Sequence, residues 1–256
     1  MAKRNTQWRR RSILDRLADT GEVTVEALSA EFHTSEVTIR KDLAALESNG
    51  LLLRRYGGAI PLPQDLLRDG ASVPSPTKQQ IARLAATRIR DHNRIIIDSG
   101  HTTAALLPEL SARRGLVVMT NSLGIATALM ELENEPTLLM TGGTWDARSE
   151  SFQGQVAEQM LRAYDFDQLF IGADGLDLER GTTTFNELYS LSRVMAEVAR
   201  EVIVMAESDK LGRRIHNLEL PWQCIDILVT DAGISDVARR ALEAQQVHVL
   251  VAETQY

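Results

Sequence analysis

The chain has 256 residues, of which 44% are hydrophobic and 25% charged, and its formal net charge is −7. This length suits one large or two modest domains, and the apolar fraction excludes a mainly disordered chain. The single cysteine, Cys224, excludes a disulfide scaffold and a thiolate metal cluster. No apolar run approaches the roughly 20 residues of a membrane span, and the basic N-terminus lacks the apolar core of an export signal. We therefore expect a soluble protein in the reducing environment of the cytoplasm.

The charge is distributed unevenly along the chain. Residues 1–60 contain ten Lys and Arg against eight Asp and Glu, and five of those basic residues lie within the first eleven positions. Residues 61–256 contain 18 against 27, so the net charge changes from +2 to −9. A basic part and an acidic part indicate different partners, and a polyanion suits the basic part. A chance distribution of charge is the alternative.

Three short helices are predicted in the first sixty residues. Residues 9–19 carry apolar side chains at helical spacing, and Gly21 is expected to end this helix. Thr24 has the character of an N-cap for a second helix, and Thr34 or Ser35 for a third that runs to about residue 49. Three short helices with a tight connection between the second and third predict a helix-turn-helix unit.

The third helix has two different faces. At 100° per residue, Ser35, Ile39, Leu43 and Leu46 fall together, and we expect them to pack on the first two helices. The opposite face is small and basic near its N-terminal end, which suits insertion into a DNA major groove. An ordinary solvated helix face is the alternative. The predicted DNA-contacting residues of this helix are Ser35, Glu36, Val37, Thr38, Arg40 and Lys41.

A short hairpin is predicted directly after this helix. Residues 51–55 form a β-like run, Tyr56 begins a glycine turn, and the chain returns through Ala59 and Ile60. Such a wing can touch phosphates or the minor groove through basic residues at its tip. The candidate contacts in the wing are Arg54, Arg55 and Tyr56.

The run VTIRKDLAALESNGLLLRRYGGAI resembles the N-terminal signature of DeoR-family bacterial transcription regulators. The match covers about residues 8–60. It implies that Thr38, Arg40 and Lys41 lie on a DNA-recognition helix and that the Arg-rich wing follows. Asp42 is expected to bond within the winged-helix unit rather than to DNA. We accordingly predict a winged helix-turn-helix domain over residues 1–60.

A proline-rich linker is predicted over residues 61–76, because four of the seven prolines lie there. Beyond it, short apolar runs alternate with amphipathic segments, which is typical of an α/β domain with a mostly parallel sheet over residues 77–256. The predicted strands are residues 94–97, 116–119, 137–140, 168–171, 202–205, 225–229 and 247–251. The predicted helices are residues 102–113, 123–132, 153–164, 188–199 and 237–244.

Small polar residues follow four successive predicted strands. Ligands of such sheets bind at the carboxyl ends of the strands, so these loops are the candidate site. The first loop, DSGHTT over residues 98–103, suits a phosphate, although a plain N-capped turn has a similar sequence. Asn121, Gly142, Gly143 and Asp174 occupy corresponding places after later strands. Together these ends fit a polyhydroxylated, phosphorylated small molecule.

The segments IIIDSGHTT, MTNSL, LLMTGGTWDARSESFQG and FDQLFIGADGLDLERGTTTFNELYSLS resemble the DeoR-family C-terminal sensor domain. That domain is similar in fold to ribose-5-phosphate isomerase, glucosamine-6-phosphate deaminase and CoA-transferase subunits. The TTFNE and DLERG runs are closest to repressors of sugar-alcohol and amino-sugar operons, such as the glucitol, galactitol and N-acetylgalactosamine systems. The effector-binding residues that the resemblance implies are Asp98, Ser99, Gly100, His101, Thr102, Thr103, Asn121, Gly142, Gly143, Asp174, Glu187 and Lys210.

The sequence departs from the family pattern at two places. His101 stands where Ser or Thr is usual, which removes a hydroxyl from the first loop, although an imidazole can still donate to a phosphate. Glu207-Ser208-Asp209-Lys210 replaces the usual Asp-Ser-Ser-Lys, which adds a carboxylate near the lysine.

The resemblance to the DeoR family therefore implies a DNA-binding repressor of a carbohydrate operon, for a sugar alcohol or an amino sugar, that a phosphorylated sugar releases from operator DNA. It is expected to be a homodimer or homotetramer, with no cofactor, no metal and no membrane partner. A sugar-phosphate isomerase-like enzyme is the main alternative, since several carboxylates are available, but fold alone does not carry chemistry. A purely structural oligomerisation domain is the third hypothesis, and it does not account for the repeated polar strand ends.

Overall fold

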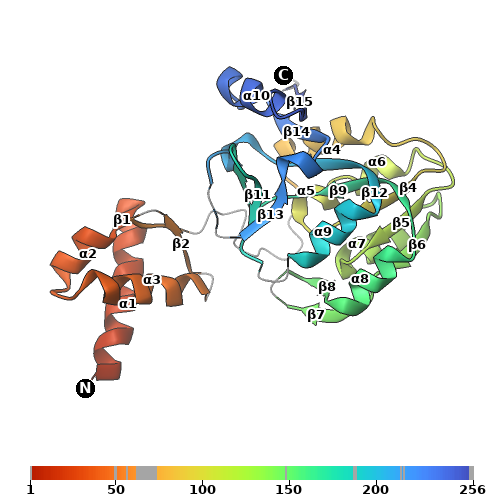
Figure 1. The fold of residues 1–256 in the computed structure, drawn as a ribbon. Helices are drawn as coiled ribbons and strands as arrows, with labels where there is room; N and C mark the ends of the chain where they lie inside the picture. The colour runs from red at the N-terminus through yellow and green to blue at the C-terminus, as the bar shows by residue number, and fades with distance from the viewer. Residues whose placement is uncertain are drawn as a thin grey trace. The chain divides into compact units, whose positions relative to one another are not determined.

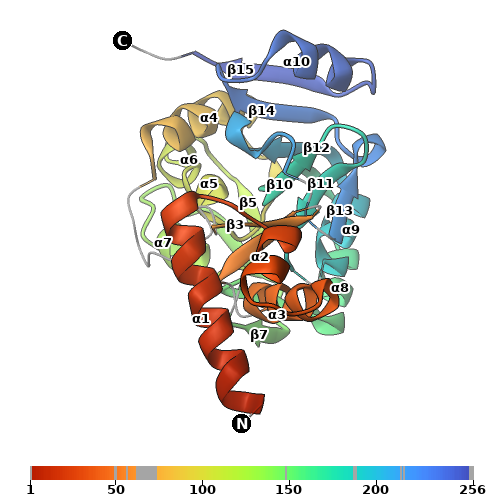
Figure 2. The same cartoon turned by 90° about the vertical axis from the view of Figure 1, so that its left-hand side faces the viewer.

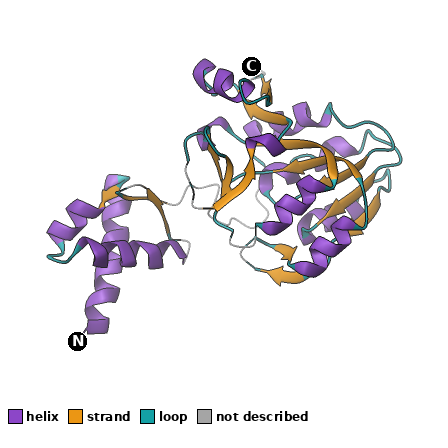
Figure 3. Ribbon diagram, viewed as in Figure 1, coloured by secondary structure: helices purple, strands orange, loops and turns teal. Residues whose placement is uncertain are grey.

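The computed structural model describes residues 2–48, 51–55, 57–61, 74–147, 149–186, 189–213, 215 and 217–253, with the backbone alone at residues 2–5, 48 and 55. The chain divides into two compact units, Met1–Ser72 and Val73–Tyr256 (Figures 1 and 3). In the part of the chain so described, no helix has the length and apolar character needed to cross a membrane.

The first unit is a winged helix, as predicted. Its elements are α1 (Ala2–Thr20), β1 (Val23–Thr24), α2 (Val25–Glu31), α3 (Glu36–Ser48), β2 (Leu52–Arg55) and β3 (Gly58–Pro61), drawn in red to orange in Figure 2. Gly21 follows α1 with a φ of +74°, and the Thr24 hydroxyl accepts a hydrogen bond from the amide of Ala27 at 3.1 Å. The predicted end of the first helix at Gly21 and the predicted N-cap of the second helix at Thr24 are both confirmed. The β2–β3 hairpin is also present, and β1 adds an unpredicted third antiparallel strand beside β3.

The core of this unit is formed by one face of α3 against α1 and α2. Ile39, Leu43 and Leu46 are buried there together with Ile13 and Leu28. The prediction that Ser35 packs with them is wrong, since Ser35 is exposed. The residue precedes α3, so helical periodicity does not apply to it. Its hydroxyl lies 2.9 Å from that of Thr38, at the start of the helix.

Asp42 is buried within the first unit, with only 2% of its surface exposed. Its two carboxylate oxygens accept hydrogen bonds from Nε of Arg9 at 2.5 Å and Nε of Arg10 at 2.9 Å. Two opposite charges satisfy a carboxylate that burial would otherwise penalise. Asp42 therefore ties α3 to α1, as predicted.

The second unit is built on a seven-stranded parallel sheet. The strands lie in the order β15-β14-β12-β9-β4-β5-β6. All seven predicted strands are confirmed in this sheet. Their bounds are β4 (Arg94–Ile97), β5 (Val117–Thr120), β6 (Thr137–Met140), β9 (Phe166–Ile171), β12 (Ala199–Met205), β14 (Ile227–Asp231) and β15 (His248–Ala252).

Helices cover both faces of this sheet and enclose two cores. One core contains Ile95, Ile97 and Phe170 beneath α4, α6 and α7, and the other contains Ile96 and Leu169 beneath α8, α9 and α10. Helices α8 and α9 lie side by side (Figure 1). The helices are α4 (Pro76–Ala86), α5 (His101–Ala104), α6 (Leu107–Leu110), α7 (Leu123–Met130), α8 (Gln155–Arg162), α9 (Ser190–Glu197) and α10 (Asp236–Glu243).

The helix predicted over residues 102–113 is two short helices, α5 and α6, instead. Pro108 accounts for the break, because proline has no amide hydrogen to continue the ladder of hydrogen bonds. Helix α4 was not predicted. It begins at Pro76, with Ser75 as its N-cap, whereas the predicted linker over residues 61–76 lies mostly outside the described residues.

Two smaller β structures were also unpredicted. An antiparallel sheet, in the order β10-β11-β13, and a β7–β8 hairpin lie apart from the large sheet. Short 3₁₀ helices, η2 (Ser208–Lys210) and η3 (Trp222–Cys224), precede and follow β13. The strands are β7 (Thr144–Asp146), β8 (Ser151–Gln153), β10 (Gly175–Asp177), β11 (Gly181–Thr184) and β13 (Asn217–Pro221).

Candidate DNA interface and effector site

The predicted DNA-contacting face of α3 is open to solvent. Val37 is 59% exposed, and Arg40 and Lys41 are exposed as well. Arg40 donates from Nη2 to the carboxylate of Glu36 at 2.7 Å. Glu36 thus has a neighbouring cation as its partner. This exposed ion pair leaves both side chains accessible to DNA, because such pairs are weak and easily exchanged.

The wing places its arginines differently. Nε of Arg54 donates to Glu47 at 2.7 Å, and the Arg54 amide donates to the other oxygen of that carboxylate at 2.9 Å. Glu47 is buried at the end of α3, so Arg54 also fastens the wing to the helix. Only the backbone of Arg55 is described, in β2, and Tyr56 lies outside the described residues. A DNA contact by these three residues stays a prediction.

The effector-site candidates lie at the carboxyl edge of the large sheet. From β4 the chain continues through β5 to β6 on one side, and it then returns to β9 on the other side of β4. The strand order thus reverses between β4 and β9, and open α/β sheets bind ligands at such a reversal. Asp98 directly follows β4, and Asp174 lies three residues beyond β9.

The loop after β4 is joined to the loop after β5 by one side chain. Nδ2 of Asn121 donates to Oδ1 of Asp98 at 2.8 Å, and its Oδ1 accepts from the Ser99 amide at 3.0 Å. Asn121 is fully buried. Burial is the main cause that raises the pKa of Asp98 to about 6, with the charge of Asp174 adding to it and the bonds from Asn121 and Ser99 opposing it. The structure therefore brings three predicted site residues, Asp98, Ser99 and Asn121, into contact.

The remainder of the β4 loop serves mainly to hold its own shape. The Thr103 hydroxyl donates within the loop, to the carbonyl oxygens of Asp98 at 2.8 Å and Gly100 at 2.9 Å. Thr103 and Thr102 are buried, whereas His101 is exposed. Gly100 has a φ of +143°, which favours glycine. Thr103 thus supports the loop, and His101 is positioned where solvent can reach it.

The two glycines after β6 allow a close approach of chains. A side chain on Gly143, whose φ is +113°, would begin only 2.5 Å from the carbonyl oxygen of Gln153. Gly142 also has a positive φ, of +59°. The glycines therefore permit the β7–β8 hairpin to fold back over the end of β6.

The loop after β9 is held by the small sheet and by η2. Oδ2 of Asp174 accepts from the Thr184 hydroxyl at 2.8 Å and from the Phe185 amide at 3.1 Å. Nζ of the buried Lys210 donates to the carbonyl oxygen of Ala173 at 2.8 Å. The loop after β9 thus carries Asp174 and, next to it, the backbone oxygen that Lys210 binds. Glu187, the remaining predicted effector residue, lies outside the described residues.

Glu207 and the added carboxylate, Asp209, both have partners other than Lys210. Glu207 accepts a hydrogen bond from the Ser75 hydroxyl at 3.2 Å and lies 3.7 Å from Nζ of Lys78, both at the start of α4. Asp209 forms an ion pair with Arg213. The changed sequence around Lys210 thus anchors its segment to α4.

Glu219 on β13 was not among the predicted residues. Its carboxyl group accepts from the hydroxyls of Ser192 at 2.8 Å and Thr182 at 3.2 Å, and only 7% of the residue is exposed. Burial, followed by the charges of Asp98 and Asp174, raises its pKa to about 8. A protonated carboxyl group therefore accompanies two acids of the candidate site at neutral pH. No sequence motif marked it, since its partners are remote along the chain.

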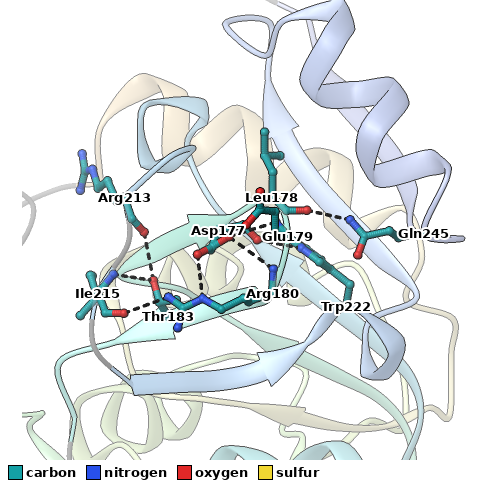
Figure 4. A network of polar contacts seen from close by, with 9 residues as sticks. All are labelled: Asp177, Leu178, Glu179, Arg180, Thr183, Arg213, Ile215, Trp222 and Gln245. Atoms are coloured by element: carbon teal, nitrogen blue, oxygen red, sulfur yellow. Dashed lines mark hydrogen bonds and ion pairs between the residues drawn. The ribbon is translucent and has the colours of Figure 1, made fainter. Parts of the chain in front are cut away.

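A polar network fixes the turn between β10 and β11 (Figure 4). Asp177 accepts from Nε of Arg180 at 2.8 Å, and its carbonyl oxygen accepts from Nε1 of the buried Trp222 at 2.9 Å. Nη2 of Arg180 in turn donates to the carbonyl oxygen of Ile215 at 3.3 Å. The network joins the turn to the segment that follows η2. It therefore supports the small sheet that carries Glu219.

Comparison with known proteins identifies both units. Residues 9–64 match the DeoR-like helix-turn-helix domain, and residues 75–232 match the DeoR C terminal sensor domain. The chain belongs to the DeoR family. This confirms the predicted family, and it identifies the first unit as the DNA-binding domain of a transcriptional regulator.

Similar relatives support the assignment to the DeoR family. The putative aga operon transcriptional repressor of Escherichia coli O157:H7 is 39% identical over 96% of this chain and 94% of its own. The HTH-type transcriptional regulator GlpR of Haloferax volcanii is 32% identical over 94% of this chain and 96% of its own. Among solved structures, ribose 5-phosphate isomerase A from Methanocaldococcus jannaschii is similar over 54% of each chain, with 19% identity and a TM-score of 0.40. The relatives that match over the full length are thus named as regulators.

Proposed function

We propose that this DeoR-family chain is a repressor of a carbohydrate operon that leaves its operator when a phosphorylated sugar or sugar alcohol binds. The observation that carries the proposal is the joining of Asp98, Ser99 and Asn121 at the reversal of the strand order, next to the loop that holds Asp174 and Lys210. Two of the predicted strand ends are thus linked by one buried amide, which supports a binding site more than a set of separate loop caps.

The chemistry of these groups favours a ligand with several hydroxyls. Asp98 and Asp174 are acceptors for hydroxyl hydrogens, and the protonated carboxyl group of Glu219 can donate or accept. A phosphate requires positive charge and amide donors. Lys210 and the backbone of the β4 loop are the groups that we assign to it.

The proposed repression requires more than one DNA-binding unit. A single winged helix makes few base contacts, so tight operator binding is achieved by two or four chains on repeated half-sites. We infer that the second unit pairs the chains and that the effector changes their relative placement. A preference of a few kcal/mol for one conformation changes operator occupancy by about 10- to 1000-fold. The name of the putative aga operon transcriptional repressor supports repression.

The test uses the full chain and a duplex selected by it from a random DNA library. Fluorescence anisotropy measures operator binding while hexose, hexitol, hexosamine and N-acetylhexosamine phosphates are added one at a time. We expect one of these compounds to release the DNA and to raise the melting temperature of the protein. No release and no stabilisation by any of them would contradict the sensor. Formation of a product from one of them would instead support the enzyme alternative.

Two variants separate the roles of the two units. Arg40→Ala is expected to weaken operator binding and to leave effector binding unchanged. Asp98→Ala is expected to leave operator binding intact and to abolish its response to the effector. Loss of both properties in either variant would contradict the proposed division.

A further inference from the structure

Strand β8 of the β7–β8 hairpin buries its polar side chains, whereas the aromatic face of the hairpin is partly exposed. Thr144 pairs with Gln153 and Asp146 with Ser151, whereas Trp145 pairs with Phe152 on the other face. Ser151 and Gln153 are buried, but Trp145 is 44% exposed. A hairpin that packs on an ordinary core buries its apolar face. The reversed pattern indicates that the interior next to this hairpin is polar.

A chain of hydrogen bonds sets the orientation of the Gln153 amide. The Asp146 carboxylate can only accept, so the Ser149 hydroxyl, 2.5 Å away, donates to it. Ser149 then accepts from the Ser151 hydroxyl at 2.7 Å, and Ser151 in turn accepts from Nε2 of Gln153, also at 2.7 Å. Each hydroxyl has one hydrogen, so the direction of the whole chain follows from the carboxylate. The amide carbonyl of Gln153 is therefore turned away from Ser151.

This carbonyl oxygen is left without a partner. Gln153 is only 4% exposed, and its Oε1 is buried with no hydrogen-bond partner among the described residues. Leaving a buried acceptor unpaired costs free energy, so a hydrogen-bond donor that reaches this oxygen gains from pairing with it. The orientation is thus maintained by three other side chains although it leaves an oxygen unsatisfied.

The position of the hairpin connects this oxygen with the candidate effector site. The Phe152 amide donates to the carbonyl oxygen of Asn121 at 2.8 Å, and Ser151 forms a β-bridge with Ser122. Gly143, at the end of β6, lies against the backbone of Gln153. The hairpin is therefore attached to the same loop whose side-chain amide binds Asp98.

We propose that Oε1 of Gln153 accepts a hydrogen bond from a hydroxyl or amide N–H of the sugar effector and so determines which effector is recognised. This inference rests on the proposed function. A site built to bond a particular hydroxyl rejects an analogue that lacks it, because the buried acceptor then stays unpaired. Gln153 thus selects for the presence of one donor on the ligand, independently of the phosphate.

The test compares two buried glutamines. Gln168 on β9 also has an unpartnered Oε1 and is 6% exposed, but its Nε2 bonds to the Arg88 carbonyl oxygen and to Glu201, away from the carboxyl edge. Gln153→Met and Gln168→Met each remove an amide and keep the side-chain length. With the phosphorylated compound that releases the wild-type protein from its operator, we expect Gln153→Met to bind roughly 5- to 150-fold more weakly. Gln168→Met is expected to bind it as the wild type does.

Monodeoxy analogues of that compound identify the donor. One analogue is expected to bind the wild type more weakly than the parent compound does. Gln153→Met is expected to bind this analogue and the parent compound equally well. Operator affinity without ligand is expected to be unchanged, which separates this role from a general loss of structure. If Gln153→Met does not fold, Ser151→Ala takes its place, since it keeps the acceptor but frees the amide to rotate, and it should weaken binding.

The outcomes distinguish the inference from the function on which it rests. If the wild type responds and neither Gln153→Met nor Ser151→Ala alters the affinity, the role of Gln153 is overturned and the sensor stands. A loss that is equal in Gln168→Met overturns it as well. If no compound releases the wild type, the proposed function fails and the inference fails with it.

Discussion

The charge of Asp98, at the end of β4, helps to keep Glu219 on β13 protonated. Burial has the largest effect on the pKa of Glu219. Burial and the charges of Asp98 and Asp174 together raise this pKa to about 8. The loop after the large sheet's β4 thereby influences a carboxyl group of the small sheet. One consequence concerns stability, and it can be measured without knowing the ligand.

The stability of the protein is expected to fall as pH rises through the range set by Glu219. An unfolded chain releases this proton near pH 4.5, whereas the folded chain retains it to about pH 8. The folded state therefore binds more protons in between, and the free energy of unfolding decreases with rising pH until about 8. Glu219→Gln removes this contribution. Its melting temperature, measured from pH 5 to 8 by differential scanning fluorimetry, should exceed that of the wild type by a margin that grows by several degrees. A constant margin would contradict the burial of an uncharged Glu219.

Asn121→Ala is expected to disconnect the loops after β4 and β5. Loss of two buried hydrogen bonds should lower the free energy of unfolding by about 1–3 kcal/mol. It should also raise the pKa of Asp98 further, because the amide of Asn121 favours the ionised form. The effector concentration needed to release operator DNA is expected to increase. Asn134→Ala is the control, since Asn134 bonds two backbone carbonyl oxygens that lie away from these loops. An equal shift in both variants would show that the change is merely structural.

Asp42→Ala is expected to lower the free energy of unfolding of the DNA-binding unit. The substitution removes the acceptor for Arg9 and Arg10 and leaves two like charges close together, which should cost about 2–4 kcal/mol. Hydrogen exchange measured by mass spectrometry should show faster exchange in α1 and α3 and no change in the seven-stranded sheet. Asp19→Ala, an exposed aspartate on α1, serves as the control. Unchanged protection of α1 would contradict the proposed role of Asp42.

Arg40 and Arg54 are expected to respond differently to truncation. Among the described residues, Arg40 has only an exposed partner, so Arg40→Ala should alter stability by less than about 0.5 kcal/mol while weakening operator binding. If Arg40 contacts a phosphate, the slope of log K against log salt should decrease by about 1. Arg54→Ala instead removes an ion pair with the buried Glu47 and should destabilise the wing.

Glu47→Gln separates the two possible roles of Arg54. It weakens the same ion pair while keeping the arginine. If Arg54 contacts DNA, Arg54→Ala should weaken operator binding more than Glu47→Gln at the same loss of stability. Equal losses would assign Arg54 to the fold alone.

The large sheet could be predicted from the sequence because its strands are buried on both faces. Such strands are continuous apolar runs, and residues 94–97 and 202–205 are examples. The small sheet could not be predicted in this way. β11 has the sequence Gly-Thr-Thr-Thr, which has no apolar alternation, and its partner β13 lies more than thirty residues further along the chain. Glu219 was missed for the same reason.

The errors at helix ends also have physical causes. Residues 2–8 have no apolar periodicity, so the start of α1 was placed at residue 9. Helical periodicity was extended one residue too far at Ser35, which lies outside α3. The strand-end residues Asp98, Ser99 and Asn121 lie in contact, because parallel strands present their carboxyl ends at one edge. The roles of Gly143 and Gln153 depend on a hairpin that the sequence did not indicate.

The pairing of β4 with β9 also has a consequence for biosynthesis. β4 belongs to the first part of the sensor unit to leave the ribosome, and β9 follows about seventy residues later. Asp174 and Glu219, the neighbours of Asp98, are therefore synthesised only when most of the chain has been made. Incomplete chains present a bare edge of β4 and no assembled site, so an unfinished repressor lacks the means to respond to its effector.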